Sequence, residues 1–98
     1  MSIQFVLDTA ARVTNNRTMP DIFRAMNGEM NELADEVQLV LDGGEPGPDG
    51  ILGEAVDVMS CLLDLIYKSN PNITQADIEA VMQKKALKWE RLYAKAVY

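Results

Sequence analysis

The chain has 98 residues, of which 48% are hydrophobic, and its 15 acidic and 9 basic residues give a formal net charge of −6. This composition indicates one globular domain, and the acidic excess argues against a nucleic-acid polymer as ligand, because a basic surface must neutralise the phosphates. A single cysteine excludes an internal disulfide, and the lack of histidine excludes histidine-based acid–base catalysis and histidine-ligated zinc.

The hydrophobic residues are spread along the chain rather than gathered into a membrane segment. No stretch approaches the roughly 20 apolar residues that a membrane helix needs, and the N-terminus lacks the basic region of a signal peptide. We therefore expect no membrane contact and a cytoplasmic location. Because a chain this short has a thin core, its abundant apolar surface also predicts that subunits share a core in a homo-oligomer.

Clusters of helix-breaking residues divide the chain into four segments. The strongest is the glycine- and proline-rich stretch 43–50, a second lies at 69–72, and a weaker one lies at 15–18. No run alternates with a period of two, so no strand is expected. The sequence therefore predicts one all-α domain over residues 1–98, with helices over 2–14, 19–42, 51–68 and 74–96.

Two of these helices begin with threonine caps. Thr18 precedes Pro20, which stands in the first turn, where a helix tolerates proline. Thr74 is followed three residues later by Asp77, an acidic variant of the capping box. Both positions predict a helix start.

The second predicted helix places a carboxylate on its apolar side. On a helical wheel, Glu29 lies within about 20° of Ile22 and Val40, which belong to the apolar arc. Glu32 and Glu36 border the same arc. A carboxylate on a buried stripe is costly unless it is paired or bound to a cation. This placement is the first sign of chemistry in the sequence.

The fourth predicted helix carries the opposite charge. Lys85 lies within its apolar stripe, about 40° from Trp89. A lysine in such a place either extends outward to solvent or reaches into an acidic, phosphate-binding pocket. A basic band runs beside the stripe and consists of Lys84, Lys88, Arg91 and Lys95.

Two short motifs repeat one spacing of acidic residues. Glu29-Met-Asn-Glu32 and Glu54-Ala-Val-Asp57 each place two carboxylates at positions i and i+3, on neighbouring parts of a helix face. Each motif alone is typical of a solvated acidic face. Two such helices packed antiparallel would bring four carboxylates to one point, and carboxylate oxygens are ligands that Mg²⁺ prefers.

The two motifs and their surroundings resemble the MazG-type all-α nucleoside triphosphate pyrophosphohydrolases. Residues 28–33, Gly-Glu-Met-Asn-Glu-Leu, are similar to the E-x-x-E-L motif of that family, and residues 53–58, Gly-Glu-Ala-Val-Asp-Val, to its E-L-x-D-V motif. Residues 88–91, Lys-Trp-Glu-Arg, are similar to the basic and aromatic segment that closes the family domain. The resemblance covers residues 15–93, and the short chain is similar to the single-domain, phage-type members.

Two positions depart from the family pattern. Lys85 stands where family members often carry an asparagine, and Cys61 stands where an aromatic residue is frequent, one turn after the aspartate of the second motif. Both positions bear on substrate recognition, so the preferred base stays open.

The resemblance implies a four-helix bundle completed by homo-oligomerisation, as a tetramer built from dimers or as a dimer. It implies hydrolysis of nucleoside or deoxynucleoside triphosphates to monophosphate and pyrophosphate with Mg²⁺, or Mn²⁺ in its place. The implied metal ligands are Glu29, Glu32, Glu54 and Asp57.

Further roles follow from the resemblance and from the helix faces together. One of Glu32 and Glu36 is expected to orient the attacking water, and the phosphates are expected to contact Lys85, Lys88 and Arg91. Trp89 or Phe23 stacks on the base, or each of them serves the core, as buried aromatic residues usually do. Two alternatives stay open. One is a non-catalytic helical interaction module, and the other is a relative specific for phosphoribosyl-ATP or dUTP.

Overall fold

The computed structural model of the chain describes residues 2–13 and 16–94. Over these residues the regular structure is entirely helical, which confirms the all-α prediction. The helices are α1 (Ile3–Arg12), α2 (Met19–Leu41), α3 (Gly50–Ser69) and α4 (Gln75–Tyr93). Six of the eight helix ends lie within one residue of their predicted places, whereas α1 ends at Arg12 and α4 at Tyr93, two and three residues before the predicted ends. The ends predicted at residues 14 and 96, and the side chain of Lys95, lie outside the described residues.

Both predicted threonine caps are confirmed. The Thr18 hydroxyl accepts a hydrogen bond from the Asp21 backbone N–H at 3.3 Å, and the Asp21 carboxylate accepts one from the Thr18 N–H at 2.9 Å. Thr74 and Asp77 form the same reciprocal pair at 3.3 and 3.0 Å. Each box satisfies two donors that a helix start leaves free, and it fixes where α2 and α4 begin.

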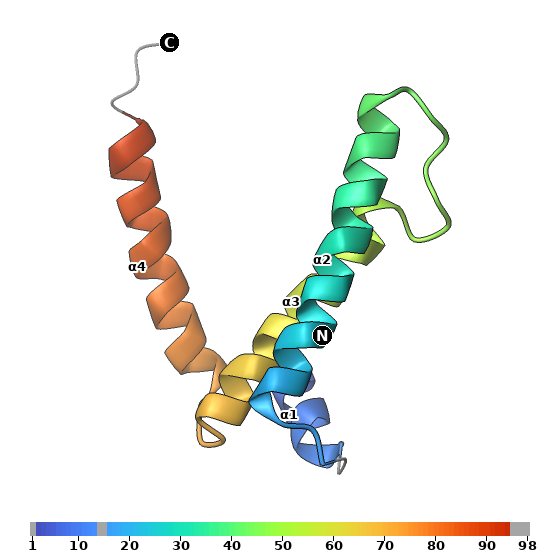
Figure 1. Ribbon diagram of the computed structural model, residues 1–98. Coiled ribbons are helices and arrows are strands. Elements are labelled where there is room, and N and C mark those ends of the chain that lie inside the picture. Colours follow the sequence, from blue (N-terminus) through green and yellow to red (C-terminus); the bar gives the residue numbers. More distant parts are fainter. Residues whose placement is uncertain (1, 14–15, 95–98) are drawn as a thin grey trace.

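Helices α2 and α3 form an antiparallel hairpin, and α1 packs across the end of the hairpin opposite the connecting loop (Figure 1). The small core lies at this crossing, where α1 and α2 bury their apolar faces. Within the described residues the buried hydrophobic side chains are Leu7, Ala10, Ile22, Met26 and Ile78. The core thus occupies one end of the molecule, and the loop end of the hairpin extends away from it.

Among the described residues, helix α4 contacts the rest of the chain at its N-terminal end. Gln4 and Gln75 exchange two hydrogen bonds, each from the backbone N–H of one residue to the side-chain oxygen of the other, at 2.8 and 2.9 Å. Ile78 is the buried residue of this helix. Beyond it, α4 diverges from the hairpin and forms a V with it (Figure 1). The single chain is therefore all-helical with a divergent last helix, and completion of a bundle by oligomerisation stays a prediction.

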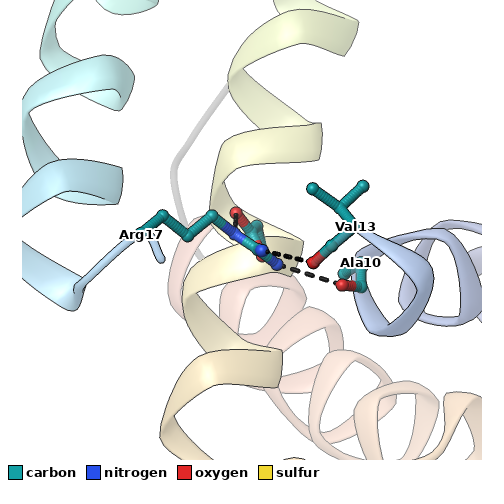
Figure 2. A network of polar contacts seen from close by, with 4 residues as sticks. Ala10, Val13 and Arg17 are labelled. Carbon is teal, nitrogen blue, oxygen red and sulfur yellow. Dashed lines mark hydrogen bonds and ion pairs between the residues drawn. The ribbon is translucent and has the colours of Figure 1, made fainter. Parts of the chain in front are cut away.

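Arg17 ties α1 to the hairpin, as Figure 2 shows. Its guanidinium donates to the backbone carbonyls of Val13 at 2.9 Å and Ala10 at 3.1 Å. It also donates to both oxygens of Asp64 in α3, at 2.6 and 2.8 Å. The hydrogen bonding of the guanidinium to the Asp64 carboxylate is the main reason that the Arg17 pKa is raised, and burial opposes it. The same arginine therefore satisfies carbonyls at the end of α1 and fixes that end against α3.

None of the described helices combines the length and the apolar character needed to cross a membrane.

Candidate metal centre

The hairpin brings the two acidic motifs together. Glu29 and Glu32 project from the middle of α2, and Glu54 and Asp57 project from the first two turns of α3. Each residue offers one carboxylate oxygen, and these four oxygens all lie within 4.8 Å of one another. The i and i+3 spacing in both motifs predicted this convergence, because antiparallel packing of the two helices places their acidic faces at the same level along the hairpin. We call these four residues the carboxylate quartet.

The quartet has an inner and an outer half. Glu29 and Glu54 are half-buried, whereas Glu32 and Asp57 are exposed. One oxygen of each inner residue, Oε2 of Glu29 and Oε2 of Glu54, is buried and has no hydrogen-bond partner among the described residues. A buried carboxylate oxygen without a partner loses its hydration and gains nothing in return. The inner half therefore favours a proton or a cation.

The electrostatics of the quartet agree with its geometry. Burial is the main cause that raises the pKa of Glu29, followed by the hydrogen bond and the charge of Glu32 and the charge of Asp57. Burial also raises the pKa of Glu54, with the negative charges of Glu32, Asp49 and Asp57 adding to it. These carboxyls resist ionisation because they are partly buried among negative charges, and no cation of the described residues offsets those charges.

No basic side chain neutralises the quartet over residues 2–13 and 16–94. The two ion pairs in that part of the chain use other carboxylates, those of Asp21 and Asp64. The negative charge of the quartet is thus left for an external cation.

The donor set indicates which ion would fit. All four ligand atoms are carboxylate oxygens, which suit hard divalent cations, and the set contains neither histidine nor thiolate. The exposed outer pair leaves a side of the cluster open to water and to further ligands. The four residues could therefore hold a divalent metal ion such as Mg²⁺ or Mn²⁺.

Glu36 has a different role from the quartet. Its side chain is buried, and its Oε1 accepts a hydrogen bond from the Gly47 backbone N–H at 2.9 Å. A Cβ atom at position 47 would lie 3.0 Å from Glu36 Oε2, so the loop approaches this carboxylate closely because residue 47 is glycine. Glu36 thus fastens the loop between α2 and α3. Of the two residues predicted to orient water, Glu32 lies in the quartet and Glu36 does not.

The predicted phosphate and base contacts lie on α4, away from the quartet. Lys85, Lys88 and Arg91 are exposed, and the described part of α4 has close backbone contact with α1 but with neither α2 nor α3. Trp89 is 66% exposed and meets Tyr93 edge to face, with ring centroids 6.3 Å apart. Trp89 therefore does not serve the core of the single chain, and one chain does not bring these four side chains to the carboxylates.

Two further residues, Asp49 and Cys61, lie beside the quartet, and the sequence analysis gave Asp49 no role. Asp49 precedes α3 and contributes to the raised pKa of Glu54. A Cβ at position 53 would lie 2.7 Å from the Cβ of Asp49, so glycine at this position leaves room for it. The sequence signal that could have pointed to Asp49 is its place two residues before the helix predicted over 51–68. Cys61 is half-buried one turn after Asp57, and its thiol pKa is raised by burial and by the charges of Glu29, Asp64 and Asp57.

Comparison of the chain with family models, with curated proteins and with solved structures found no match. The resemblance to MazG-type proteins therefore rests on the two acidic motifs and the closing basic and aromatic segment themselves, and it stays a prediction. The structure adds to these motifs the observation that carboxylate oxygens of both converge on one place.

Proposed function

We propose that this chain is a divalent-cation-dependent hydrolase of nucleoside or deoxynucleoside triphosphates, acting in the cytoplasm and releasing pyrophosphate and a monophosphate. One observation carries the proposal. Two carboxylate pairs from separate helices converge within 4.8 Å, and two of their oxygens are buried without a hydrogen-bond partner. A cation that satisfies those oxygens can also bind phosphate oxygens, which brings a triphosphate to an otherwise acidic surface.

In this reaction a water oxygen bonds to the α-phosphorus, and the bond from that phosphorus to the oxygen bridging toward the β-phosphorus breaks. A bound Mg²⁺ would neutralise phosphate charge and lower the pKa of coordinated water. Glu29, Glu54, Glu32 and Asp57 are the proposed ligands. Glu32 is also the proposed residue that orients the attacking water and accepts its proton, because it is exposed within the quartet whereas Glu36 is engaged by the loop.

In this proposal the fourth helix recognises the substrate. Lys85, Lys88 and Arg91 are three of its exposed cations and lie near an exposed aromatic residue, Trp89, so that together they could contact phosphates and a base. Because they lie away from the quartet in one chain, the proposal includes a homo-oligomer, either a dimer or a tetramer built from dimers.

A panel of substrates tests the proposal. The purified protein is incubated with the ribonucleoside and deoxyribonucleoside triphosphates, dUTP and phosphoribosyl-ATP among them, and pyrophosphate release is measured with Mg²⁺, with Mn²⁺ and with a chelator. We expect pyrophosphate with at least one substrate in the presence of metal, and none with the chelator. Absence of release from the whole panel, or release that the chelator leaves unchanged, contradicts the proposal.

A non-catalytic interaction module is the second candidate, and the exposed apolar and basic surface of α4 favours it. Thermal melting separates the two. A ligand that binds the folded state raises the melting temperature by mass action. A hydrolase of this kind gains stability from Mg²⁺ together with a triphosphate, whereas an interaction module does not.

A further inference from the structure

The loop of residues 42–49, which joins α2 to α3, is fixed against α2. The chain turns back along the last turns of α2 before it enters α3 (Figure 1). The Gly44 N–H donates a hydrogen bond to the Leu39 carbonyl at 2.9 Å. Gly43 and Gly50 have φ values of 77° and 64°, in the left-handed region that favours glycine. The loop therefore begins and ends at defined turns.

Glu36 holds the middle of this loop. It is 9% exposed and is the only charged side chain that is buried among residues 2–13 and 16–94. Its Oε1 accepts the hydrogen bond from the Gly47 backbone N–H, and a hydrogen bond to a carboxylate is stronger than one to a neutral acceptor. Burying a carboxylate costs free energy that an apolar side chain would not cost. What Glu36 contributes in return is the position of the loop.

The contact between Glu36 and the loop lies on the face of α2 that carries the quartet. On a helical wheel Glu36 lies about 20° from Glu29 and about 40° from Glu32, and along the helix axis it lies about 6 Å beyond Glu32. The loop thus crosses this face one turn from the quartet. Toward the other end of α2 the same face buries Ile22 in the core. The quartet is therefore bounded by the core on one side and by the loop on the other.

Asp49 is the last residue of the loop, and its side chain lies beside the quartet. A Cβ atom at position 53 would lie 2.7 Å from the Asp49 Cβ, 3.6 Å from its Cγ and 3.9 Å from its Oδ1. The carboxyl group therefore lies over Gly53, and its charge contributes to the raised pKa of Glu54. Asp49 is not one of the four residues whose oxygens lie within 4.8 Å of one another. Its carboxylate thus lies at the edge of the quartet and outside it.

A carboxylate at the start of a helix ordinarily serves the helix itself. Asp49 is the N-cap of α3, but its backbone has φ −88° and ψ −26°, and its side chain makes no capping hydrogen bond among the described residues. Thr18 and Thr74, by contrast, have extended backbones, and their side chains cap α2 and α4. Asp49 is exposed, so water reaches its oxygens. The start of α3 does not account for the place of this carboxylate.

A hard cation held by a few carboxylates keeps several of its waters, and acceptors around a metal site orient what the ion binds. We propose that Asp49 is a positioning residue of the quartet, whose carboxylate accepts a hydrogen bond from a water that the bound cation keeps. In the same proposal, Glu36 acts through Gly47 to hold the loop that carries Asp49. The inference rests on the proposed function, which supplies the cation, and it gives Glu36 a role through the loop instead of on the attacking water.

Calorimetric Mg²⁺ titration of the purified full chain tests the role of Asp49. Asp49→Ala removes the acceptor and is expected to weaken Mg²⁺ binding about tenfold. Glu45→Ala is the matched control, because it removes the same charge from an exposed position of the same loop, and it is expected to bind Mg²⁺ as the wild type does. A residue that served only the start of α3 would instead lower the metal-free melting temperature and leave the affinity unchanged.

Gly53→Ala moves Asp49 without removing a charge. The added methyl group would lie too close to the Asp49 Cβ, so the side chain must shift, and we expect the same loss of Mg²⁺ affinity. Without metal, this variant is expected to melt no lower than the wild type, because alanine favours a helix more than glycine does. In an Asp49→Gly background the clash is absent, and Gly53→Ala is expected to cause no further loss.

Two substitutions of Glu36 test its action through the loop. Glu36→Gln keeps an oxygen that accepts the Gly47 N–H and is expected to retain the wild-type Mg²⁺ affinity. Glu36→Met removes the acceptor and is expected to weaken binding about as much as Asp49→Ala does. The two changes together are expected to cost no more than either alone, because both act through one carboxylate. Equal losses for Glu36→Gln and Glu36→Met would show that Glu36 acts by its own charge, which overturns its positioning role.

The outcomes distinguish this inference from the proposed function. Wild-type Mg²⁺ affinity in Asp49→Ala overturns the inference and leaves the quartet as a metal site. A wild-type chain that binds neither Mg²⁺ nor Mn²⁺ overturns both. Weakened binding in Asp49→Ala and Gly53→Ala, with no pyrophosphate release by the wild type from any substrate of the panel, supports the role of Asp49 and overturns the proposed reaction. If Glu36→Met unfolds the chain, Asp49→Ala and Gly53→Ala decide.

Discussion

The helical hairpin contains three buried or half-buried glutamates whose carboxylates have different partners. Glu36 is buried, and the Gly47 backbone N–H satisfies it. Glu29 and Glu54 are half-buried, and each has one buried oxygen with no hydrogen-bond partner in the described part of the chain. The first is a structural contact that fastens a loop. The other two face further carboxylates, and this arrangement is stable only if a proton or a cation enters it.

The substitution Glu54→Gln tests this interpretation of the quartet. The change removes one negative charge and one oxygen ligand, so we expect metal affinity and pyrophosphate release to fall by about 100-fold or more, by comparison with the smaller losses seen for residues that only support metal ligands. Without metal, the variant is expected to melt at a higher temperature than the wild type, because repulsion in the quartet is relieved. Calorimetric Mg²⁺ titration and thermal melting measure the two effects.

Glu45→Gln is the matched control for this substitution, because Glu45 is exposed in the loop and the charge change is the same. It is expected to bind metal as the wild type does. Full activity of Glu54→Gln, or its unfolding in the absence of metal, would show that Glu54 is not a metal ligand.

The raised pKa values of Glu29 and Glu54 predict how stability depends on pH without metal. In the interval above the ordinary glutamate pKa, the folded chain binds more protons at these sites than the unfolded chain does. The free energy of unfolding therefore falls as pH rises through that interval, and the loss is complete above the raised pKa values. We expect the metal-free wild type to gain more from mild acidification than Glu54→Gln does, as measured by melting temperature. Saturating Mg²⁺ should remove that difference.

At the scale of helices, Arg17 decides how α1 sits on the hairpin. Its guanidinium joins the last carbonyls of α1 to Asp64 of α3, and the side chains of Arg17 and Asp64 are only 14% and 23% exposed. Asp64 lies two turns after Asp57 on α3. The arginine thus neutralises the acidic face of α3 at one point, and no cationic side chain of residues 2–13 or 16–94 pairs with the quartet.

Arg17→Met is expected to lower the free energy of unfolding by about 3 kcal/mol, because it leaves a largely buried carboxylate without its charge partner. Asp64→Asn is expected to cost about 1 kcal/mol, since the asparagine oxygen still accepts a hydrogen bond from Arg17. Urea denaturation at one fixed protein concentration measures both values. Arg24→Met is the control, because Arg24 is 72% exposed in its pair with Asp21, and it should change stability little. Equal losses for Arg17→Met and Arg24→Met would contradict the assigned role.

At the scale of the whole molecule, the acidic site and the basic helix are separated. The quartet needs only α2 and α3, which form the hairpin, whereas the cations proposed to contact phosphate are carried by α4 on the other side of the V. A single chain therefore keeps the candidate metal site apart from the cations that are proposed to contact phosphate. The two parts can meet only if subunits associate or if α4 changes direction.

Ligand binding should therefore stabilise the protein in two steps. Mg²⁺ alone is expected to raise the melting temperature, and Mg²⁺ with a non-hydrolysable triphosphate analogue to raise it further. At a ligand concentration one hundred times the dissociation constant, the gain is about 2.7 kcal/mol. The analogue without metal should have no effect, and a chelator should reverse the gain. Stabilisation by the analogue without metal would show that the nucleotide binds elsewhere than at the quartet.

Local patterns in the sequence determined the helices and the carboxylate quartet. Breaker residues and threonine caps act within a few positions, so Thr18, Thr74 and the stretch 43–50 fixed the helix ends. The i and i+3 spacing also fixed which acids share a helix face. Tertiary structure alone decided that Glu54 lies half-buried rather than on a solvated face, because burial depends on which side of α3 meets α2.

Tertiary structure likewise decided the contacts of Arg17 and Glu36 and the direction of α4. Arg17 pairs with Asp64, 47 residues later, and Glu36 meets Gly47 through a loop that folds back on α2. No periodicity encodes such contacts, since they arise only when separate elements pack. The apolar stripe of the fourth helix indicated that one of its faces avoids water, but such a pattern does not say which surface covers that face.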